Sequence, residues 1–282
     1  MNKGINAWCF PESYSINDLF KSAKKHRFEG VELNLSEDPS APLFLHMKDK
    51  DLMDIKHKAT EAGLSLLSVS TDLFWKYPLT HDDDHVRRKG LSIAEEMIRI
   101  AGIFKADTIL VVPGIVNEQV SYETAYKRSQ ESLHRLIPLA ERANITIGIE
   151  NVWNKFLLSP LEMRRFVDEF ESGSIGIYFD VGNVYPYGYA DQWIRILSDR
   201  IKAVHIKDFK KSVGNINGFV PLLAGDIKWK RITEALEEIG YDGFISPEIT
   251  PHPHFQQQFI KNLSVTMDEI FHFQRQQGDM HE

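Results

Sequence analysis

Four short apolar runs in the second half of the chain each end in a charged or ionisable residue, and this pattern constrains the fold more than any other feature. The runs are rich in β-branched and aromatic residues, and helical patterns separate them, which is typical of βα units with a parallel sheet. Their last residues are Glu150, Asp180, His205 and Glu248. Side chains at the carboxyl ends of parallel strands meet at one edge of the sheet. The pattern therefore predicts that these four side chains lie together.

The same alternation of apolar run and helical pattern extends over the whole chain. Four earlier strands are expected at residues 3–10, 30–35, 64–70 and 106–113. Helices are expected at residues 17–27, 50–62, 86–104, 122–143, from Ser159 onward, and at 191–197, 229–239 and 255–274. Eight strands with a helix after each, in 282 residues without a composition break, predict one (β/α)8 TIM barrel domain over residues 1–282.

Composition excludes several classes of protein. The net charge of −7 argues against a nucleic-acid partner, which would favour a basic face. Cys9 is the single cysteine, so no internal disulfide is expected, and a reducing, cytoplasmic location is predicted. No apolar run is long enough to span a bilayer, and the first residues lack the apolar core of a signal peptide. We therefore expect no membrane partner.

Three carboxylates and an imidazole in one pocket repel one another unless a cation lies among them. The sequence therefore predicts one divalent metal ion held by Glu150, Asp180, His205 and Glu248. Oxygen ligands with one imidazole suit Mn²⁺, Zn²⁺, Co²⁺ or Mg²⁺ better than a thiolate-preferring metal, and Mn²⁺ is our first expectation. For any one of the four taken alone, capping a strand or pairing with a lysine is an equally good explanation.

Three further polar residues follow the same strand ends. Asn151 and Asn183 are predicted to orient ligands or to bind a substrate hydroxyl, although Asn183 is equally typical of a turn. Lys207 lies two residues after His205 and is predicted to bind a phosphate or an enediolate oxygen. A solvated loop lysine is at least as good an explanation of Lys207.

The second strand and the aromatic residues supply the remaining candidates. Glu32 and Asn34 alternate inward at the end of that strand and are predicted to contact substrate. Trp8 and Trp153 are predicted to form an apolar wall against which a sugar stacks. Phe74 and Trp75 lie in an aromatic loop at residues 71–85, where packing over the barrel is the simpler explanation.

These strand ends resemble those of the sugar phosphate isomerase/epimerase superfamily, the xylose isomerase-like barrels. The resemblance rests on Ile149-Glu150-Asn151, Phe179-Asp180-Val181-Gly182-Asn183, His205-Ile206-Lys207-Asp208, Pro247-Glu248, Val31-Glu32-Leu33-Asn34, and residues 220–229 and 239–243. It covers nearly the whole chain and is specific for fold and metal site rather than for substrate.

The resemblance implies metal-dependent proton transfer on a sugar or sugar phosphate, and a homo-oligomer such as a dimer or tetramer. In the 3-epimerases of the superfamily, two adjacent substrate oxygens bind the metal and two Glu ligands lie on opposite faces of the carbon between them. Carried over, Glu150 and Glu248 are the acid/base pair and an enediolate links the two epimers. Asp180 and His205 complete the site.

Two positions depart from the free-ketohexose 3-epimerases of the superfamily. Asn183 stands where they tend to have a His, and Phe156 where they tend to have a Glu. Both departures weaken a free-ketohexose assignment. Asn183 resembles the branch that acts on ketopentose or hexulose phosphates, for which Lys207 and residues 208–225 are the expected phosphate region. Endonuclease IV shares the barrel but uses more histidines, and Ser70 and Asn183 stand at two of those positions.

The sequence therefore predicts an epimerase or isomerase that works through an enediolate. An inosose dehydratase-like lyase would use the same metal and base but would eliminate water. A non-catalytic sugar-binding barrel is the alternative from a different class, and the pair Glu150 and Glu248 argues against it.

Overall fold

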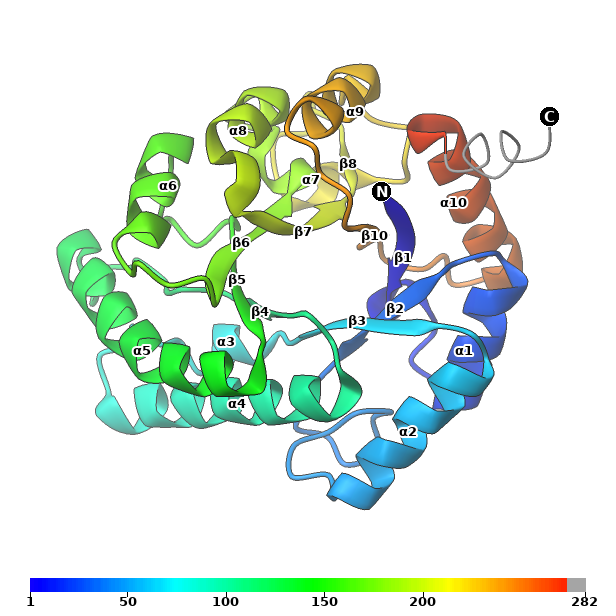
Figure 1. The fold of residues 1–282 in the computed structure, drawn as a ribbon. Coiled ribbons are helices and arrows are strands. Elements are labelled where there is room, and N and C mark those ends of the chain that lie inside the picture. Colours follow the sequence, from blue (N-terminus) through cyan, green and yellow to red (C-terminus); the bar gives the residue numbers. More distant parts are fainter. Residues whose placement is uncertain (273–282) are drawn as a thin grey trace.

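The computed structural model describes residues 1–272 and shows a closed barrel of parallel strands surrounded by helices (Figure 1). Around the ring the order is β1-β10-β7-β6-β5-β4-β3-β2, so consecutive barrel strands are neighbours in space. The barrel strands are β1 (Asn2–Asn6), β2 (Gly30–Asn34), β3 (Ser65–Ser70), β4 (Thr108–Val111), β5 (Thr146–Glu150), β6 (Ile175–Asp180), β7 (Ile201–Ile206) and β10 (Phe244–Pro247). The predicted (β/α)8 TIM barrel is confirmed.

Eight helices cover the outside of the barrel within the described residues. They are α1 (Ile16–Lys25), α2 (Asp49–Glu61), α4 (Asp84–Phe104), α5 (Tyr122–Ala143), α6 (Pro160–Asp168), α8 (Ala190–Leu197), α9 (Trp229–Glu238) and α10 (Gln256–Phe271). Their bounds match the predicted helices to within a few residues, and Ser159 caps α6 as its sequence predicts. The predicted end of the last helix at Gln274 lies outside the described residues. No helix within residues 1–272 is long and apolar enough to cross a membrane.

The first predicted strand and two predicted connections differ locally from the structure. The first strand was expected to run to Phe10, but β1 ends at Asn6 because the Asn6 side chain accepts a hydrogen bond from the Trp8 backbone N–H and starts a 3₁₀ turn, η1 (Ala7–Cys9). After Asp180, where a turn was one of two explanations of Asn183, the chain forms a short helix, α7 (Val181–Val184). The Asp180 side chain caps it by accepting from the Asn183 N–H at 2.9 Å. The predicted aromatic loop contains another short helix, α3 (Leu73–Lys76).

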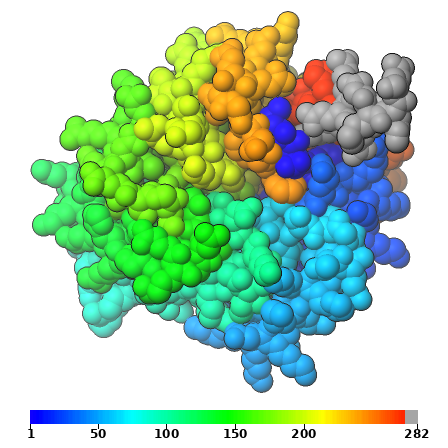
Figure 2. Space-filling model, viewed as in Figure 1, coloured from blue at the N-terminus to red at the C-terminus, as the bar shows by residue number. Residues whose placement is uncertain are grey.

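Side chains fill the ring, as the space-filling view of the face with the chain's N-terminus shows (Figure 2). The filling is not purely apolar, because Glu32, Ser68 and His205 lie fully buried together with the Tyr178 ring. Tyr178 lies against Gly148 of β5, where a Cβ would approach its side chain to 3.1 Å. A small residue on one strand thus makes room for an aromatic ring on the next.

The long connection after β7 is organised by the carboxylate of Asp208. This fully buried carboxylate accepts hydrogen bonds from the backbone N–H groups of Phe209 (2.8 Å) and Leu223 (3.0 Å) and from the Trp229 indole (3.0 Å). Gly225 packs so closely on it that a Cβ would collide with the carboxylate. Within this connection β8 (Asp208–Phe209) pairs with β9 (Phe219–Val220), after the short helix η3 (Ile216–Gly218). Asp208 therefore holds this connection beside the carboxyl end of β7.

Candidate metal centre

Glu150, Asp180, His205 and Glu248 come together at the carboxyl ends of four consecutive barrel strands. Each offers one ligand atom, and these four atoms all lie within 4.8 Å of one another. Glu150 and Asp180 are the last residues of β5 and β6, His205 is the last but one of β7, and Glu248 follows β10 directly. This is the grouping that the sequence pattern predicts. Ligands around one divalent ion, each about 2.1 Å from it, lie up to ~4 Å apart, so the cluster has the dimensions of a single-ion site.

Strand register accounts for the grouping. Asp180 and His205 are direct partners across β6 and β7, so their side chains leave the ring at the same level. Glu248 is brought to that level by its backbone N–H, which donates to the carbonyl oxygen of Ile206 at 3.1 Å. Because residue pairs in register share a face of the sheet, the alternation that buries these strands also directs the four side chains inward.

His205 is fixed by a buried carboxylate beneath it. Its Nε2 atom lies 3.1 Å from Glu32 Oε1, and the same carboxylate accepts hydrogen bonds from Ser68 (2.5 Å), Asn6 and Tyr178. Burial alone would raise the pKa of Glu32, but the charge of His205 and these hydrogen bonds lower the pKa to about 2. Burial opposes a charged imidazole, yet Glu32 raises the pKa of His205 to about 9.

Lys207 supplies positive charge to the carboxylates. Its ammonium lies 2.8 Å from Asp180 Oδ2 and also pairs with Glu248 Oε2. Burial, and then the charge of Glu248, raises the pKa of Glu150 well above its usual range, with Lys207 opposing the shift. Burial also raises the pKa of Asp180, again with Lys207 opposing. The carboxylates thus carry more negative charge than one lysine compensates, which is the condition that a bound cation relieves.

The donor set fits a divalent ion. The Nδ1 atom of His205 is buried and has no hydrogen-bond partner among the described residues, and it lies 3.8 Å from Glu248 Oε2. Its other ring nitrogen contacts Glu32, so Nδ1 is the nitrogen that faces the carboxylates and that offers a lone pair to an ion once its proton is displaced. Three carboxylates and a neutral imidazole are ligands that Mn²⁺, Zn²⁺ and Co²⁺ accept.

A cavity of about 1770 Å³ opens above the cluster. Glu150 and Glu248 line it, whereas Asp180 and His205 are fully buried and are not among the lining residues of the described chain. Two carboxylates are thus open to a bound molecule, and the other two groups lie behind them.

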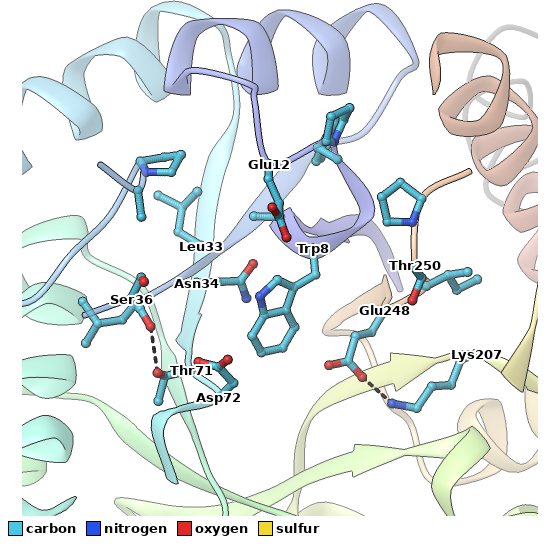
Figure 3. Close-up of a pocket in the computed structure, with 18 of the residues that line it drawn as sticks. Trp8, Glu12, Leu33, Asn34, Ser36, Thr71, Asp72, Lys207, Glu248 and Thr250 are labelled. Carbon is cyan, nitrogen blue, oxygen red and sulfur yellow. Dashed lines mark hydrogen bonds and ion pairs between the residues drawn. The ribbon is translucent and has the colours of Figure 1, made fainter. Parts of the chain in front are cut away.

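Most of the predicted substrate-binding residues also line this cavity. They are Trp8, Asn34, Trp153, Asn183 and Lys207. In Figure 3, Trp8 lies between two groups of side chains. Asn34 and Asp72 lie on one side of it, and the ion pair of Glu248 with Lys207 lies on the other. The Trp153 indole donates to the Asn183 carbonyl oxygen at 2.8 Å, which holds its ring at the wall. Their roles toward a substrate stay predictions.

Two predicted substrate-binding residues lie elsewhere. Glu32 is fully buried beneath His205. Asn151 is tied to the Asp180 backbone by two hydrogen bonds of 2.8 Å, one donated by its Nδ2 and one accepted by its Oδ1. Neither is among the cavity-lining residues of the described chain. Both contact metal-ligand candidates instead.

Sequence reasoning missed Tyr178 and undervalued Trp75. The Tyr178 ring lies 4.5 Å from the His205 ring, centroid to centroid, and its hydroxyl donates to Glu32. Since Tyr178 stands two residues before Asp180, strand alternation places both on one face and was the available signal. Trp75 lines the cavity and is 46% exposed. Phe156 packs against Tyr122 and Phe166, away from the cavity lining.

Comparison with known proteins agrees with this geometry. The family model described as xylose isomerase-like TIM barrel matches residues 20–269. L-ribulose-5-phosphate 3-epimerase UlaE of Escherichia coli O1:K1 / APEC is 25% identical over 241 residues, which cover 85% of this chain and 84% of the relative.

Two solved structures share the fold at lower identity. A D-tagatose 3-epimerase-like protein has a TM-score of 0.82 at 20% identity, covering 98% of this chain and 99% of its own. The IOLI protein, solved with a binding zinc atom, has a TM-score of 0.81 at 17% identity, covering 96% of this chain and 98% of its own. The chain belongs to the family of xylose isomerase-like TIM barrels, as its strand ends predict.

Proposed function

We propose that this protein is a divalent-metal-dependent sugar epimerase or isomerase, with ketose 3-epimerisation as its first expected reaction and Mn²⁺ as its first expected ion. The observation that carries the proposal is the division of the four ligands. Glu150 and Glu248 line the cavity, while Asp180 and His205 lie behind them. The name of the E. coli relative, a 3-epimerase, supports the choice of reaction.

A bound divalent ion would supply positive charge that acidifies a C–H bond next to a carbonyl and stabilises the developing oxyanion. Glu150, Asp180, Glu248 and the Nδ1 atom of His205 would hold it. The same four groups without a cation carry repulsion that Lys207 relieves only in part.

The reaction needs one base and one acid on opposite faces of a carbon. Glu150 would take the proton from C3, and the electrons of the C–H bond would move toward the C2 carbonyl to give an enediolate. The carboxyl group of Glu248 would then return a proton to the other face of C3, which inverts that centre. For the reverse reaction the two carboxyl groups exchange roles.

Glu32 and Asn151 act as positioning residues in this proposal rather than as substrate contacts. Glu32 holds the imidazole of His205 through Nε2, and Asn151 holds the backbone of Asp180. Such partners commonly change metal affinity about 10–100-fold when they are removed. Asn183, whose side chain donates to the Asn151 carbonyl oxygen at 3.1 Å and lies 3.4 Å from Glu150, lines the cavity and would meet substrate.

A homo-oligomer and a cytoplasmic location stay predictions from the sequence. The sedimentation velocity of the purified protein gives the oligomeric state directly. A dimer or tetramer is expected, and a monomer at all concentrations would contradict it.

The function is tested by solvent exchange. The Mn²⁺-loaded protein is incubated in D₂O with a panel of ketoses and ketose phosphates, and loss of carbon-bound protons is followed by NMR. Exchange at C3 with a new diastereomer is the expected result. The metal-free protein, prepared with a chelator, is the control and should show no exchange above background.

Other outcomes would redirect the proposal. Exchange at C1 or C2 with an aldose product indicates isomerisation. Loss of water from a cyclic ketone indicates a dehydratase of the same barrel. No exchange with any compound, while the metal remains bound, would contradict the proposed proton transfer.

A further inference from the structure

The wall of the cavity that lies away from the four ligands indicates what end group the substrate carries. We propose that this cavity takes a ketose whose non-reacting end is uncharged and bears hydroxyl groups, rather than a phosphate ester. The inference rests on the proposed function, since it concerns the substrate of that same site. It differs from the ketose phosphates that the resemblance at Asn183 and the name of the E. coli relative would suggest.

The charged groups on the cavity wall are almost all negative. Beyond the metal-ligand candidates, Glu12, Asp38 and Asp72 line the cavity. Two hydrogen bonds of 2.8 Å from Ser40, donated by its backbone N–H and its hydroxyl, lower the pKa of Asp38 and keep it ionised. No arginine or histidine of the described chain lines the cavity. A phosphate dianion would therefore meet repulsion rather than the arginine-type contacts that usually bind it.

The single lysine on the wall is already engaged. Lys207 lies between Asp180 and Glu248, at the reacting end of the cavity, and is mostly buried there. A terminal phosphate that drew Lys207 away would leave the buried carboxylate of Asp180 and the partly buried one of Glu248 with less compensation, which is costly. Lys207 is thus available to an oxygen near the reacting carbons but not to a distant phosphate.

The distal wall contains a buried acceptor that has no partner within residues 1–272. The Nδ2 atom of Asn34 donates to Ser70 at 2.6 Å, and its Oδ1 atom is buried without a hydrogen-bond partner among the described residues. An unpartnered acceptor is stabilised by a ligand that donates. Figure 3 shows Asn34 on the same wall as Asp72, with Glu12 nearby. Sugar hydroxyl groups can donate to these oxygens, whereas an ionised phosphate has only acceptor oxygens to offer.

Part of the rim backbone has no N–H group to offer a phosphate. Five prolines, which have no backbone N–H, line the cavity: Pro11, Pro42, Pro221, Pro251 and Pro253. The indole rings of Trp8 and Trp75 add apolar surface against which the C–H face of a sugar can lie. The wall is thus built for a hydroxylated chain or ring.

One feature marks where a phosphate would bind if the inference is wrong. The first residue of α10, Gln256, lines the cavity, and no side chain caps this helix. Among the described residues that line the cavity, Gln256 is the only one that begins a helix of more than two turns. The backbone N–H groups of this first turn are free to bind an anion. A preference for phosphate esters would therefore point to this terminus.

The test compares each ketose with its own terminal phosphate ester. The Mn²⁺-loaded protein is assayed for C3 exchange with L-ribulose, D-ribulose and the two xyluloses, each beside its 5-phosphate. The inference predicts that kcat/KM for the best free ketose exceeds that of its 5-phosphate by about tenfold or more. A higher kcat/KM for the 5-phosphate overturns it.

A binding measurement keeps the two proposals separable. Pentitols and pentitol 5-phosphates cannot react, and calorimetry gives their affinity for the Mn²⁺-loaded protein. Tighter binding of the pentitol supports the inference even if no ketose turns over, in which case only the proposed function fails. Tighter binding of the 5-phosphate overturns the inference whether or not exchange is seen.

A charge-reversal variant tests whether the negative charge of the cavity wall causes the preference for an uncharged end group. Asp72→Lys changes an exposed residue of the wall, and Glu131→Lys makes a charge change of the same size on an exposed residue of α5 outside the lining. Asp72→Lys should improve 5-phosphate binding severalfold at low salt, and the gain should fall as salt is added. Glu131→Lys should not change it. Equal effects of the two variants would contradict the role of the wall.

Discussion

The Nε2 atom of His205 lies 3.1 Å from Oε1 of Glu32, and both side chains are fully buried. This contact commits one ring nitrogen and leaves Nδ1 facing the carboxylates of the candidate metal centre. Metal-binding histidines are commonly held in this way, because the second hydrogen bond fixes both the tautomer and the ring orientation.

Glu32→Gln should therefore weaken Mn²⁺ binding about 10–100-fold, since a neutral amide holds Nε2 less firmly and no longer supports the imidazole electrostatically. Electron paramagnetic resonance of free Mn²⁺ during a titration measures the affinity without any assay of activity. Glu61→Gln, on the exposed surface of α2, is the matched control and should bind as the parent does. Parent-like affinity for Glu32→Gln would show that the buried carboxylate is dispensable.

Mn²⁺ binding should release protons near neutral pH. In the metal-free protein Glu32 raises the pKa of His205 to about 9, so at pH 7 the imidazole carries a proton on Nδ1 that the ion must displace. Glu150, whose pKa is also raised, adds to the release. Affinity should therefore rise with pH up to about 9 and then level. Calorimetry in two buffers of different ionisation enthalpy counts the protons, and a pH-independent affinity between pH 6 and 9 would refute this linkage.

Lys207→Met should destabilise the metal-free protein and spare the metal-loaded one. The ammonium lies between Asp180 and Glu248, and its removal leaves the buried carboxylate of Asp180 and the partly buried one of Glu248 without that partner, at a cost of about 3 kcal/mol. Urea unfolding gives the free energy of unfolding of the metal-free protein in the presence of a chelator and of the metal-loaded protein in excess Mn²⁺. Lys202→Met, at an exposed position of the same strand, should change neither. The prediction is wrong if, in the presence of chelator, Lys207→Met has the same urea midpoint of unfolding as the parent.

Asp208→Ala should loosen the connection after β7. The change leaves the backbone N–H groups and the indole that donate to this carboxylate without a partner, so the free energy of unfolding should fall by about 2 kcal/mol or more. Proteolysis should then cleave within residues 210–225. Asp199→Ala, at an exposed aspartate, should stay within about 0.5 kcal/mol of the parent. Equal urea midpoints for the two variants would contradict the bracing role.

The sequence was sufficient for the barrel and for the metal-ligand group because both depend on local pattern. Each of the four ligands ends its own apolar run, and parallel strands bring such ends together whatever the exact register. The contacts across the ring could not be predicted in the same way. Whether Glu32 reaches the cavity or lies beneath His205 depends on strand tilt and on the level at which each side chain enters the barrel.

The cavity wall was also beyond prediction from pattern. Glu12 and Asp72 lie in connections after β1 and β3, and nothing in their local sequence marks them as neighbours of one cavity. Trp8 was expected within a strand, but the Asn6 side chain ends that strand early and starts the turn that carries the indole. Such short polar contacts decide loop shape, and no periodicity reveals them.

The central claim is that Glu150 and Glu248 each transfer a proton on one face of C3. It is tested most directly by isotope exchange in single variants. Glu150→Gln and Glu248→Gln are each loaded with Mn²⁺, their metal content is verified, and both C3 epimers of the best substrate are incubated in D₂O. Each variant should exchange the C3 proton of only one epimer, namely the epimer whose C3 proton faces the remaining carboxylate. Each should also interconvert the epimers at least about 100-fold more slowly than the parent. Interconversion at the parent's rate by either variant would contradict the account.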